Sequence, residues 1–211
     1  MTLFRRFFAF VLALELACVL ASFAPASALA QTGTPSALVN EFHATLLAVM
    51  KEGPALGHAG RALRLRPEVE RTLHLPVMTQ IATGSFWRQA SPAQQDALVA
   101  AFARFSIATY AKNFKKHAGE KFETVAERLG PQDTILVDTR LVKSDGSAVE
   151  ITYVMKKGAD AWKVVDVILD KGISELALRR SEFSRQLKDS GLDSLVATLH
   201  RKADELAADA P

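Results

Sequence analysis

The spacing of large apolar residues changes twice along this chain, and that change constrains its fold more than any other feature. Between residues 36 and 116 these residues recur every three or four positions, which is typical of amphipathic helices. Between 121 and 169 they alternate with polar residues, which is typical of strands that bury one face. The helical spacing returns after residue 173. Helices, then strands, then helices predict an α+β fold in which a curved antiparallel sheet carries the helices on its concave face.

The helices of the N-terminal half are expected to be separated by loops. The first begins at Ser36 and ends at Gly53-Pro54, because glycine followed by proline stops a helix. Residues 57–66 hold three arginines and are expected to form a basic loop. Two short helices are expected to start at Pro67 and Pro76, since proline suits the first helical position.

A long helix with a strong start signal follows. Ser91 is a good N-cap, Pro92 suits the first helical position, and Gln94 completes a capping box. The apolar stripe that comes after this signal predicts that the helix continues to about Lys116.

Four strands and two closing helices complete the prediction. The strands are expected over residues 121–129, 134–142, 149–155 and 162–169. Asp145-Gly146 suits the positive φ of a tight turn and should join the second strand to the third. The fourth strand is apolar on both faces and is therefore expected at the centre of the sheet. Gly191 should separate a helix over residues 173–188 from the last one.

Residues 1–30 have the three parts of a secretory signal peptide. Arg5-Arg6 supplies the positive start, an apolar run follows, and Ala28-Leu29-Ala30 is an A-x-A cleavage site. We therefore expect export, cleavage near Ala30, and a mature single domain over residues 31–211 in a bacterial periplasm.

Two other interpretations of this segment stay open. A retained membrane anchor needs about 20 apolar residues in a row, and the uninterrupted runs here are shorter. A lipoprotein acylated on Cys18 needs a leucine-like residue three positions earlier, where Glu15 stands.

Charge and cysteine content exclude several classes of protein. The formal net charge of the 211 residues is +3, and removal of residues 1–30 leaves +2, which is small for a dedicated nucleic-acid binder. The one cysteine of the sequence, Cys18, lies in the expected signal peptide. A mature chain without cysteine has no disulfide, no thiolate nucleophile and no cysteine-bound zinc.

Catalytic and metal-binding patterns are weak. The five histidines never occur at the three- or four-residue spacing of a helical metal pair, so neither a metal nor a cofactor is expected. An acid–base enzyme would need a carboxylate in an apolar pocket, and the candidates are Asp138 and Asp166. Tyr110 or Tyr153 would then serve as a hydrogen-bond donor. Asp138, however, alternates with the apolar residues of its strand and should face away, and Asp166 can pair with a lysine or a backbone amide instead.

The aromatic residues are numerous for a chain of this size and indicate a possible cavity. The inward sides of the expected strands and the inward stripe of the long helix point at the same space. The alternative is an ordinary filled core. The strand residues predicted to form the floor of a cavity are Val137, Thr139, Ile151, Tyr153, Met155, Trp162 and Val164. The residues predicted to form its wall are Phe86, Trp87, Phe102, Phe105 and Tyr110.

Two groups of basic residues are candidates for a binding rim. They are Arg61, Arg64, Arg66, Lys112, Lys115 and Lys116. One interpretation is an ordinary solvated face. The other is a rim that contacts anionic head groups or an acidic docking partner.

The order of several motifs resembles the MlaC, or toluene-tolerance auxiliary, family. Residues 84–92 (GSFWRQASP) are similar to its G-x-[FY]-W-R-x-A-[ST]-P motif, and Thr109-Tyr110-Ala111 is similar to the TYA that follows. Residues 162–167 (WKVVDV) resemble its W-K-V-x-D-V strand. The hairpin over 144–153 and the closing helices over 180–195 also match. The resemblance extends from about residue 36 to residue 205.

This resemblance implies a periplasmic lipid carrier with an NTF2-like fold, in which acyl chains lie between the sheet and the helices. The implied ligand is a phospholipid, or a hopanoid as in the HpnM branch, and the family has no catalytic motif. The implied partners are an inner-membrane ABC transporter complex and an outer-membrane lipoprotein complex. The cavity residues would then bind lipid, with the basic rim near the head group. Two other hypotheses stay open: an NTF2-like enzyme acting on a small apolar substrate, and a transporter adaptor with a filled core.

Overall fold

The elements occur in the order that the spacing of apolar residues predicts. The computed structural model describes residues 33–208, without the side chain of Lys171, so the expected signal peptide and its cleavage site lie outside the described residues. The helices are α1 (Pro35–Thr72), α2 (Leu75–Thr83), the 3-10 helix η1 (Gly84–Gln89), α3 (Pro92–Asn113), the 3-10 turn η2 (Asp170–Gly172) and α4 (Glu175–Ala208). The strands are β1 (Lys121–Leu129), β2 (Ile135–Val142), β3 (Ala148–Lys157), β4 (Trp162–Leu169) and β5 (Ile173–Ser174). The predicted α+β class is confirmed.

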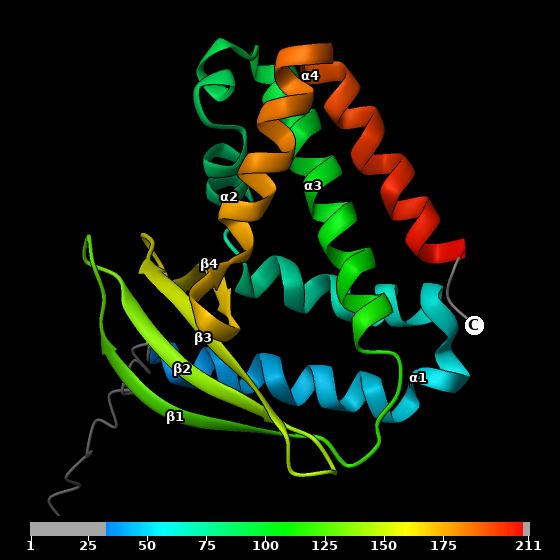
Figure 1. Cartoon of the computed structure of the whole chain (residues 1–211), viewed down its shortest axis with the longest axis vertical. Coiled ribbons are helices and arrows are strands. Elements are labelled where there is room, and N and C mark those ends of the chain that lie inside the picture. The colour runs from blue at the N-terminus through cyan, green and yellow to red at the C-terminus, as the bar shows by residue number, and fades with distance from the viewer. Residues whose placement is uncertain (1–32, 209–211) are drawn as a thin grey trace, which may run out of the picture. The chain divides into compact units, whose positions relative to one another are not determined.

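Within residues 33–208, all strands belong to one antiparallel sheet in the order β1-β2-β3-β4-β5. The turn that contains Gly146 joins β2 to β3 as predicted. Val137 pairs with Tyr153 and Thr139 pairs with Ile151, so the expected register of this hairpin is also confirmed. Figure 1 shows the curved sheet with α1 running along its concave side.

β4 is not the central strand that its two apolar faces predicted. It pairs with β3 along its length, but on its other side only its last two residues pair with β5. The pairing with β3 shifts by one residue between Val164 and Asp166, so that Val165 is skipped. A bulge of this kind re-aims the side chains that follow it. The inward residue is therefore Val164 before the bulge and Val167 after it.

α1 continues through the segment that was expected to be a basic loop. Gly57 interrupts the helical backbone with φ of 61° and ψ of 178°, a conformation that glycine adopts readily, and the helix resumes after it. His58 and Arg61 then attach the second part of α1 to α3. His58 Nε2 lies 3.1 Å and Arg61 Nε 2.8 Å from carbonyl oxygens near the end of α3. The predicted loop over 57–66 and the separate helix at Pro67 are therefore wrong.

The capping box predicted for α3 is present. Ser91 Oγ accepts a hydrogen bond from the Gln94 amide over 3.3 Å, and the Ser91 amide donates to Gln94 Oε1 over 3.1 Å. α3 ends at Asn113, short of the expected Lys116, because the backbone leaves the helical region at Phe114.

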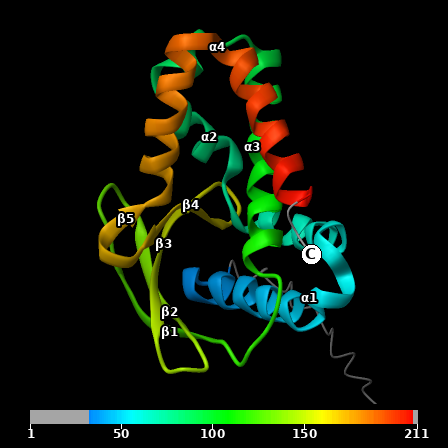
Figure 2. The same ribbon diagram turned by 45° about the vertical axis from the view of Figure 1, so that its right-hand side comes forward.

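α4 consists of two parts that meet at Gly191, as predicted. Gly191 has a φ of 76°, which breaks the helical backbone at that residue. The ring of Phe183, in the first part, packs edge-on against Phe102 of α3, with 6.3 Å between the ring centroids. The second part runs back along α3, where Arg104 forms an ion pair with Asp204. Figure 2 shows the bend between the two parts, both of which flank α3.

A filled core lies between α1 and the sheet. Its most buried members have no exposed surface: Val39, Phe42, Leu46, Val137, Met155 and Val164. We call these six residues the α1–sheet core. They join the helical stripe that begins at Pro35 to the inward faces of β2, β3 and β4.

Candidate functional site

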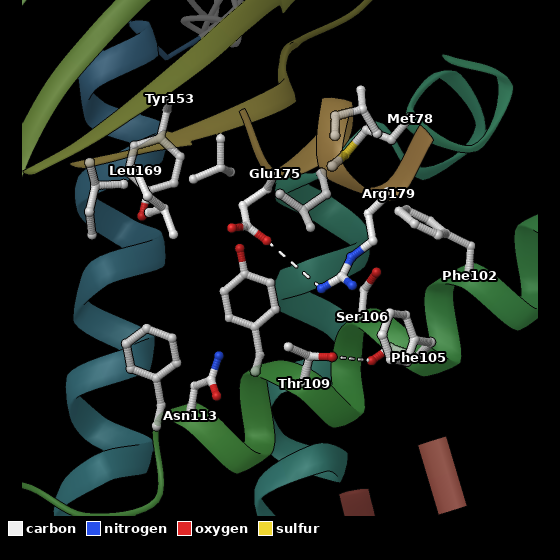
Figure 3. A pocket seen from close by; sticks show the side chains of 16 residues that line it. Met78, Phe102, Phe105, Ser106, Thr109, Asn113, Tyr153, Leu169, Glu175 and Arg179 are labelled. Atoms are coloured by element: carbon white, nitrogen blue, oxygen red, sulfur yellow. Dashed lines mark hydrogen bonds and ion pairs between the residues drawn. The ribbon is translucent and has the colours of Figure 1, made fainter. Parts of the chain in front are cut away.

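Beside the α1–sheet core, the space between the sheet and the helices is hollow. A cavity of about 210 Å³ lies between α3, the first part of α4, and strands β3 and β4. Its lining is mostly apolar, and Figure 3 shows the aromatic side chains around it. This volume is larger than the ~150 Å³ of an apolar cavity that binds benzene. The cavity therefore has room for part of a long apolar ligand.

Five residues that the sequence analysis placed around a cavity do line it. They are Phe102, Phe105, Tyr110, Ile151 and Tyr153. The first three share a face of α3, and the last two lie on the inward face of β3. The helical period and the strand period therefore converge on this space.

Four of the predicted floor residues lie in filled parts of the interior instead. Val137, Met155 and Val164 belong to the α1–sheet core, because α1 crosses the sheet in front of them. Thr139 is 1% exposed, and its hydroxyl donates a hydrogen bond to the Ile151 carbonyl over 3.0 Å. Strand alternation indicated correctly that these four residues face inward, but it does not tell a filled interior from a hollow one.

The other three predicted residues lie away from the cavity. Phe86 and Trp162 are half-buried and pack against the hydrophobic core. Trp87 lines a separate, more open groove beside α2, together with His74 and Lys163. η1, which holds both Phe86 and Trp87, therefore does not form the wall that was expected of it.

Eleven further lining residues were not predicted. They are Leu73, Met78, Ser106, Thr109, Asn113, Phe114, Val167, Leu169, Glu175, Leu176 and Arg179. Ser106, Thr109 and Asn113 continue the α3 face of Phe102, so the helical spacing contained a signal for them. Val167 and Leu169 face the cavity only because of the bulge in β4, which simple alternation does not reveal.

A buried hydrogen bond supports the cavity floor. His43 Nε2 lies 3.0 Å from the Tyr153 hydroxyl, and the imidazole stacks on Phe122 with 3.9 Å between ring centroids. Burial lowers the pKa of His43 to about 4, so the imidazole is neutral at pH 7. Burial also raises the pKa of Tyr153 well above its ordinary value. This neutral pair fixes the tyrosine ring without placing a charge under the cavity.

A second tyrosine lies on the opposite wall. Burial, and after it the negative charge of Glu175, raise the pKa of Tyr110, so its phenol stays protonated. The ring packs edge-on against Phe42, with 5.4 Å between centroids, and stacks on Phe114 at 5.8 Å. Tyr110 therefore links the cavity wall to the α1–sheet core.

The two carboxylates considered as catalytic bases lie outside the cavity lining. Asp138 accepts hydrogen bonds from Arg128 Nε and Thr152 Oγ1, both over 2.7 Å. The hydrogen bond from Arg128 holds the pKa of Asp138 below its usual value. Asp166 accepts from the Ser174 hydroxyl over 2.6 Å and from the Leu176 amide over 3.1 Å, and so caps the start of α4. Both carboxylates have structural partners.

The predicted basic rim does not form one surface. Arg61 is 1% exposed, and it donates two hydrogen bonds of 2.8 Å to carbonyl oxygens, one in α1 and one in α3. It is therefore a buried structural residue and not part of a rim. Arg64 and Arg66 are exposed and form ion pairs with glutamates within α1.

The three lysines of the predicted rim lie at the end of α3. Lys115 and Lys116 are exposed, and Lys112 is half-buried next to the lining residue Asn113. These lysines do not themselves line the cavity. That the lysines or exposed arginines contact a head group or a partner stays a prediction.

Two searches of the described part of the chain returned no feature. Among residues 33–208, no helix combines the length and apolarity needed to cross a bilayer. In the same residues, no three His, Cys, Asp or Glu side chains cluster closely enough to hold a metal ion.

The fold and the cavity together define a class: an α+β protein in which helices close an apolar cavity against the concave face of an antiparallel sheet. A family model described as MlaC protein matches residues 40–201. The chain therefore belongs to the MlaC family, as the order of its sequence motifs predicted.

A solved structure has the same fold. It is the phospholipid-binding protein from Ralstonia solanacearum, determined in complex with a phospholipid. The two chains are 25% identical and superpose with a TM-score of 0.70. The match covers 83% of this chain and 99% of the Ralstonia chain.

Proposed function

We propose that this protein is a periplasmic phospholipid carrier that holds acyl chain in the cavity between α3, α4 and the sheet. The observation that carries the proposal is an apolar cavity in a fold whose solved relative contains a phospholipid. Export through the predicted signal peptide, and a mature domain over residues 31–211, belong to the same proposal.

The energetics of lipid transfer explain why such a cavity is needed. Each CH₂ group removed from water contributes about 0.8 kcal/mol, so exposing a 16-carbon chain costs roughly 12 kcal/mol. A carrier must supply an apolar surface that replaces the bilayer. The rings of Phe102, Phe105 and Phe114 and the aliphatic side chains of β3 and β4 provide that surface here.

Family membership supports the direction of the wider proposal. We infer that the carrier moves phospholipid between an inner-membrane ABC transporter complex and an outer-membrane lipoprotein complex. A hopanoid ligand, as in the HpnM branch, stays a prediction. Neither candidate carboxylate lines the cavity, so no observation favours the alternative of an acid–base enzyme.

Lipid analysis of the protein recovered from periplasm tests the proposal. We expect phospholipid to copurify, and the N-terminus of the same preparation to lie near Gln31. Ser106→Trp should reduce bound lipid several-fold, because an indole at this lining position occupies the hollow. Ala93→Trp is the matched control, since Ala93 is exposed at the start of the same helix.

The proposal fails if the parent protein carries no lipid. It also fails if Ser106→Trp retains as much lipid as the parent and as Ala93→Trp. Hopanoid in the extract would instead identify the ligand as that of the HpnM branch.

A further inference from the structure

Two oppositely charged side chains line the otherwise apolar cavity. Glu175 and Arg179 are one turn apart at the start of α4, and both belong to the lining. Glu175 Oε2 lies 3.8 Å from Arg179 Nη2, which is too long for a hydrogen bond. Figure 3 shows the carboxylate and the guanidinium directed toward each other at the edge of the cavity.

The position of Arg179 is well determined by its other contacts. Its guanidinium carbon lies 5.1 Å from the centroid of the Phe105 ring, a cation–π geometry, and its Nη1 donates to Glu182 over 3.1 Å. The side chain is 24% exposed. The cation is therefore held at the boundary between the cavity and solvent.

Glu175 has much weaker protein contacts. Among residues 33–208 its carboxylate accepts no hydrogen bond, and the long contact with Arg179 is its one ion pair. A half-buried carboxylate with unused acceptor capacity is costly unless another group supplies donors. Its charge also acts on the Tyr110 phenol across the cavity, where it contributes to the raised pKa of Tyr110.

The position of Glu175 in the helix does not account for its surroundings. An acidic residue at the start of a helix interacts favourably with the helix dipole, but this requires no burial against a cavity. A second pair on the same helix, Arg201 and Glu205, is also four residues apart, and its side chains are 61% and 54% exposed. Glu175 and Arg179 differ from that ordinary surface pair because they face the cavity.

We propose that Glu175 and Arg179 form a head-group subsite that selects phospholipids carrying both a phosphate and a primary ammonium. This inference rests on the proposed function. The guanidinium binds the phosphate, and the carboxylate accepts hydrogen bonds from the ammonium. The acyl chains of the same lipid extend into the apolar part of the cavity. Phosphatidylethanolamine has this arrangement of charges, whereas phosphatidylglycerol has no cation to place beside Glu175.

Competition between these two lipids tests the subsite. The purified protein is incubated with vesicles of equal phosphatidylethanolamine and phosphatidylglycerol content, separated from them, and its bound lipid is quantified by mass spectrometry. We expect the ethanolamine lipid to be enriched about three-fold, the scale of a half-exposed ion pair. Glu175→Gln should return the ratio to that of the vesicles without reducing total bound lipid. Arg179→Gln should reduce both lipids, because both carry the phosphate.

Glu205→Gln is the matched control, since it removes a carboxylate from an exposed pair on the same helix. It should leave both the ratio and the total unchanged. The subsite is refuted, while the carrier function stands, if the parent binds lipid without ethanolamine enrichment or if Glu175→Gln keeps the parental ratio. A parent protein that takes up neither lipid refutes the carrier function and the subsite with it.

Discussion

The concave side of the sheet is filled where α1 crosses it and hollow where α3 and α4 stand over it. In the filled region, Phe42 and Val137 have no exposed surface. In the hollow region, Phe105 and Ile151 are each 7% exposed and line the cavity. The same kinds of residue line both regions. The difference therefore arises from how closely the covering helix approaches the sheet, and not from the chemistry of the side chains.

The largest expected contrast comes from removing a ring in each region. Phe42→Ala should lower the free energy of unfolding by about 3–5 kcal/mol, because it leaves a new void in a filled core. Phe105→Ala should cost less, because its ring already borders an empty space. Urea unfolding of both variants measures the two costs. Equal losses would mean that the cavity wall is packed as tightly as the α1–sheet core.

A pH dependence tests the boundary between the two regions. His43 is neutral in the folded protein, where its pKa is about 4, and ordinary, near 6.5, in the unfolded chain. As the pH falls from 6.5 to 4, the unfolded chain gains a proton that the folded protein does not. Stability should therefore be full above pH 6.5 and fall by up to about 3 kcal/mol across that window.

The variant His43→Phe isolates this contribution, because phenylalanine keeps a ring against Phe122 and does not titrate. The stability difference between parent and variant should shift in favour of the variant as the pH falls from 7 to 5. Parallel pH profiles would mean that His43 titrates normally in the folded protein, and hence that water from the cavity reaches the core.

The smallest expected contrast comes from adding volume. Val137→Trp should overpack the α1–sheet core and destabilise by roughly 1–3 kcal/mol, with bound lipid retained in the molecules that fold. Ile151→Trp should leave the melting temperature nearly unchanged and reduce bound lipid, because its ring enters the hollow. Melting temperature and retained lipid are measured together on each variant. A large fall in melting temperature for Ile151→Trp would mean that this region, too, behaves as filled core.

Strand and helix periods were sufficient to predict the sheet, its hairpin register and the inward stripe of α3. They predicted which residues face inward, so Ile151 and Val137 were placed together. They did not predict where α1 lies, because a helix that continues past Gly57 looked like one that stops at Gly53-Pro54. Without α1 in place, the filled and hollow parts of the sheet were indistinguishable.

The bulge in β4 limited the prediction in a second way. Alternation counted from Trp162 and Val164 predicts the wrong inward residues after Val165, so Val167 and Leu169 were not predicted. The charged pair at the start of α4 was missed for a different reason. A search for large apolar groups does not find Glu175, whose importance depends on its place beside the cavity.

The bend at Gly191 gives α4 an evolutionary property. Residues before it form one wall of the cavity, whereas residues after it return along α3, where Arg104 and Asp204 attach the chain. Gln186 bridges the bend by donating to Ser194 O over 3.0 Å. Anchorage and lining are thus assigned to different halves of one helix. Substitutions in the first half can change ligand preference in descendants of this protein while the second half preserves the scaffold.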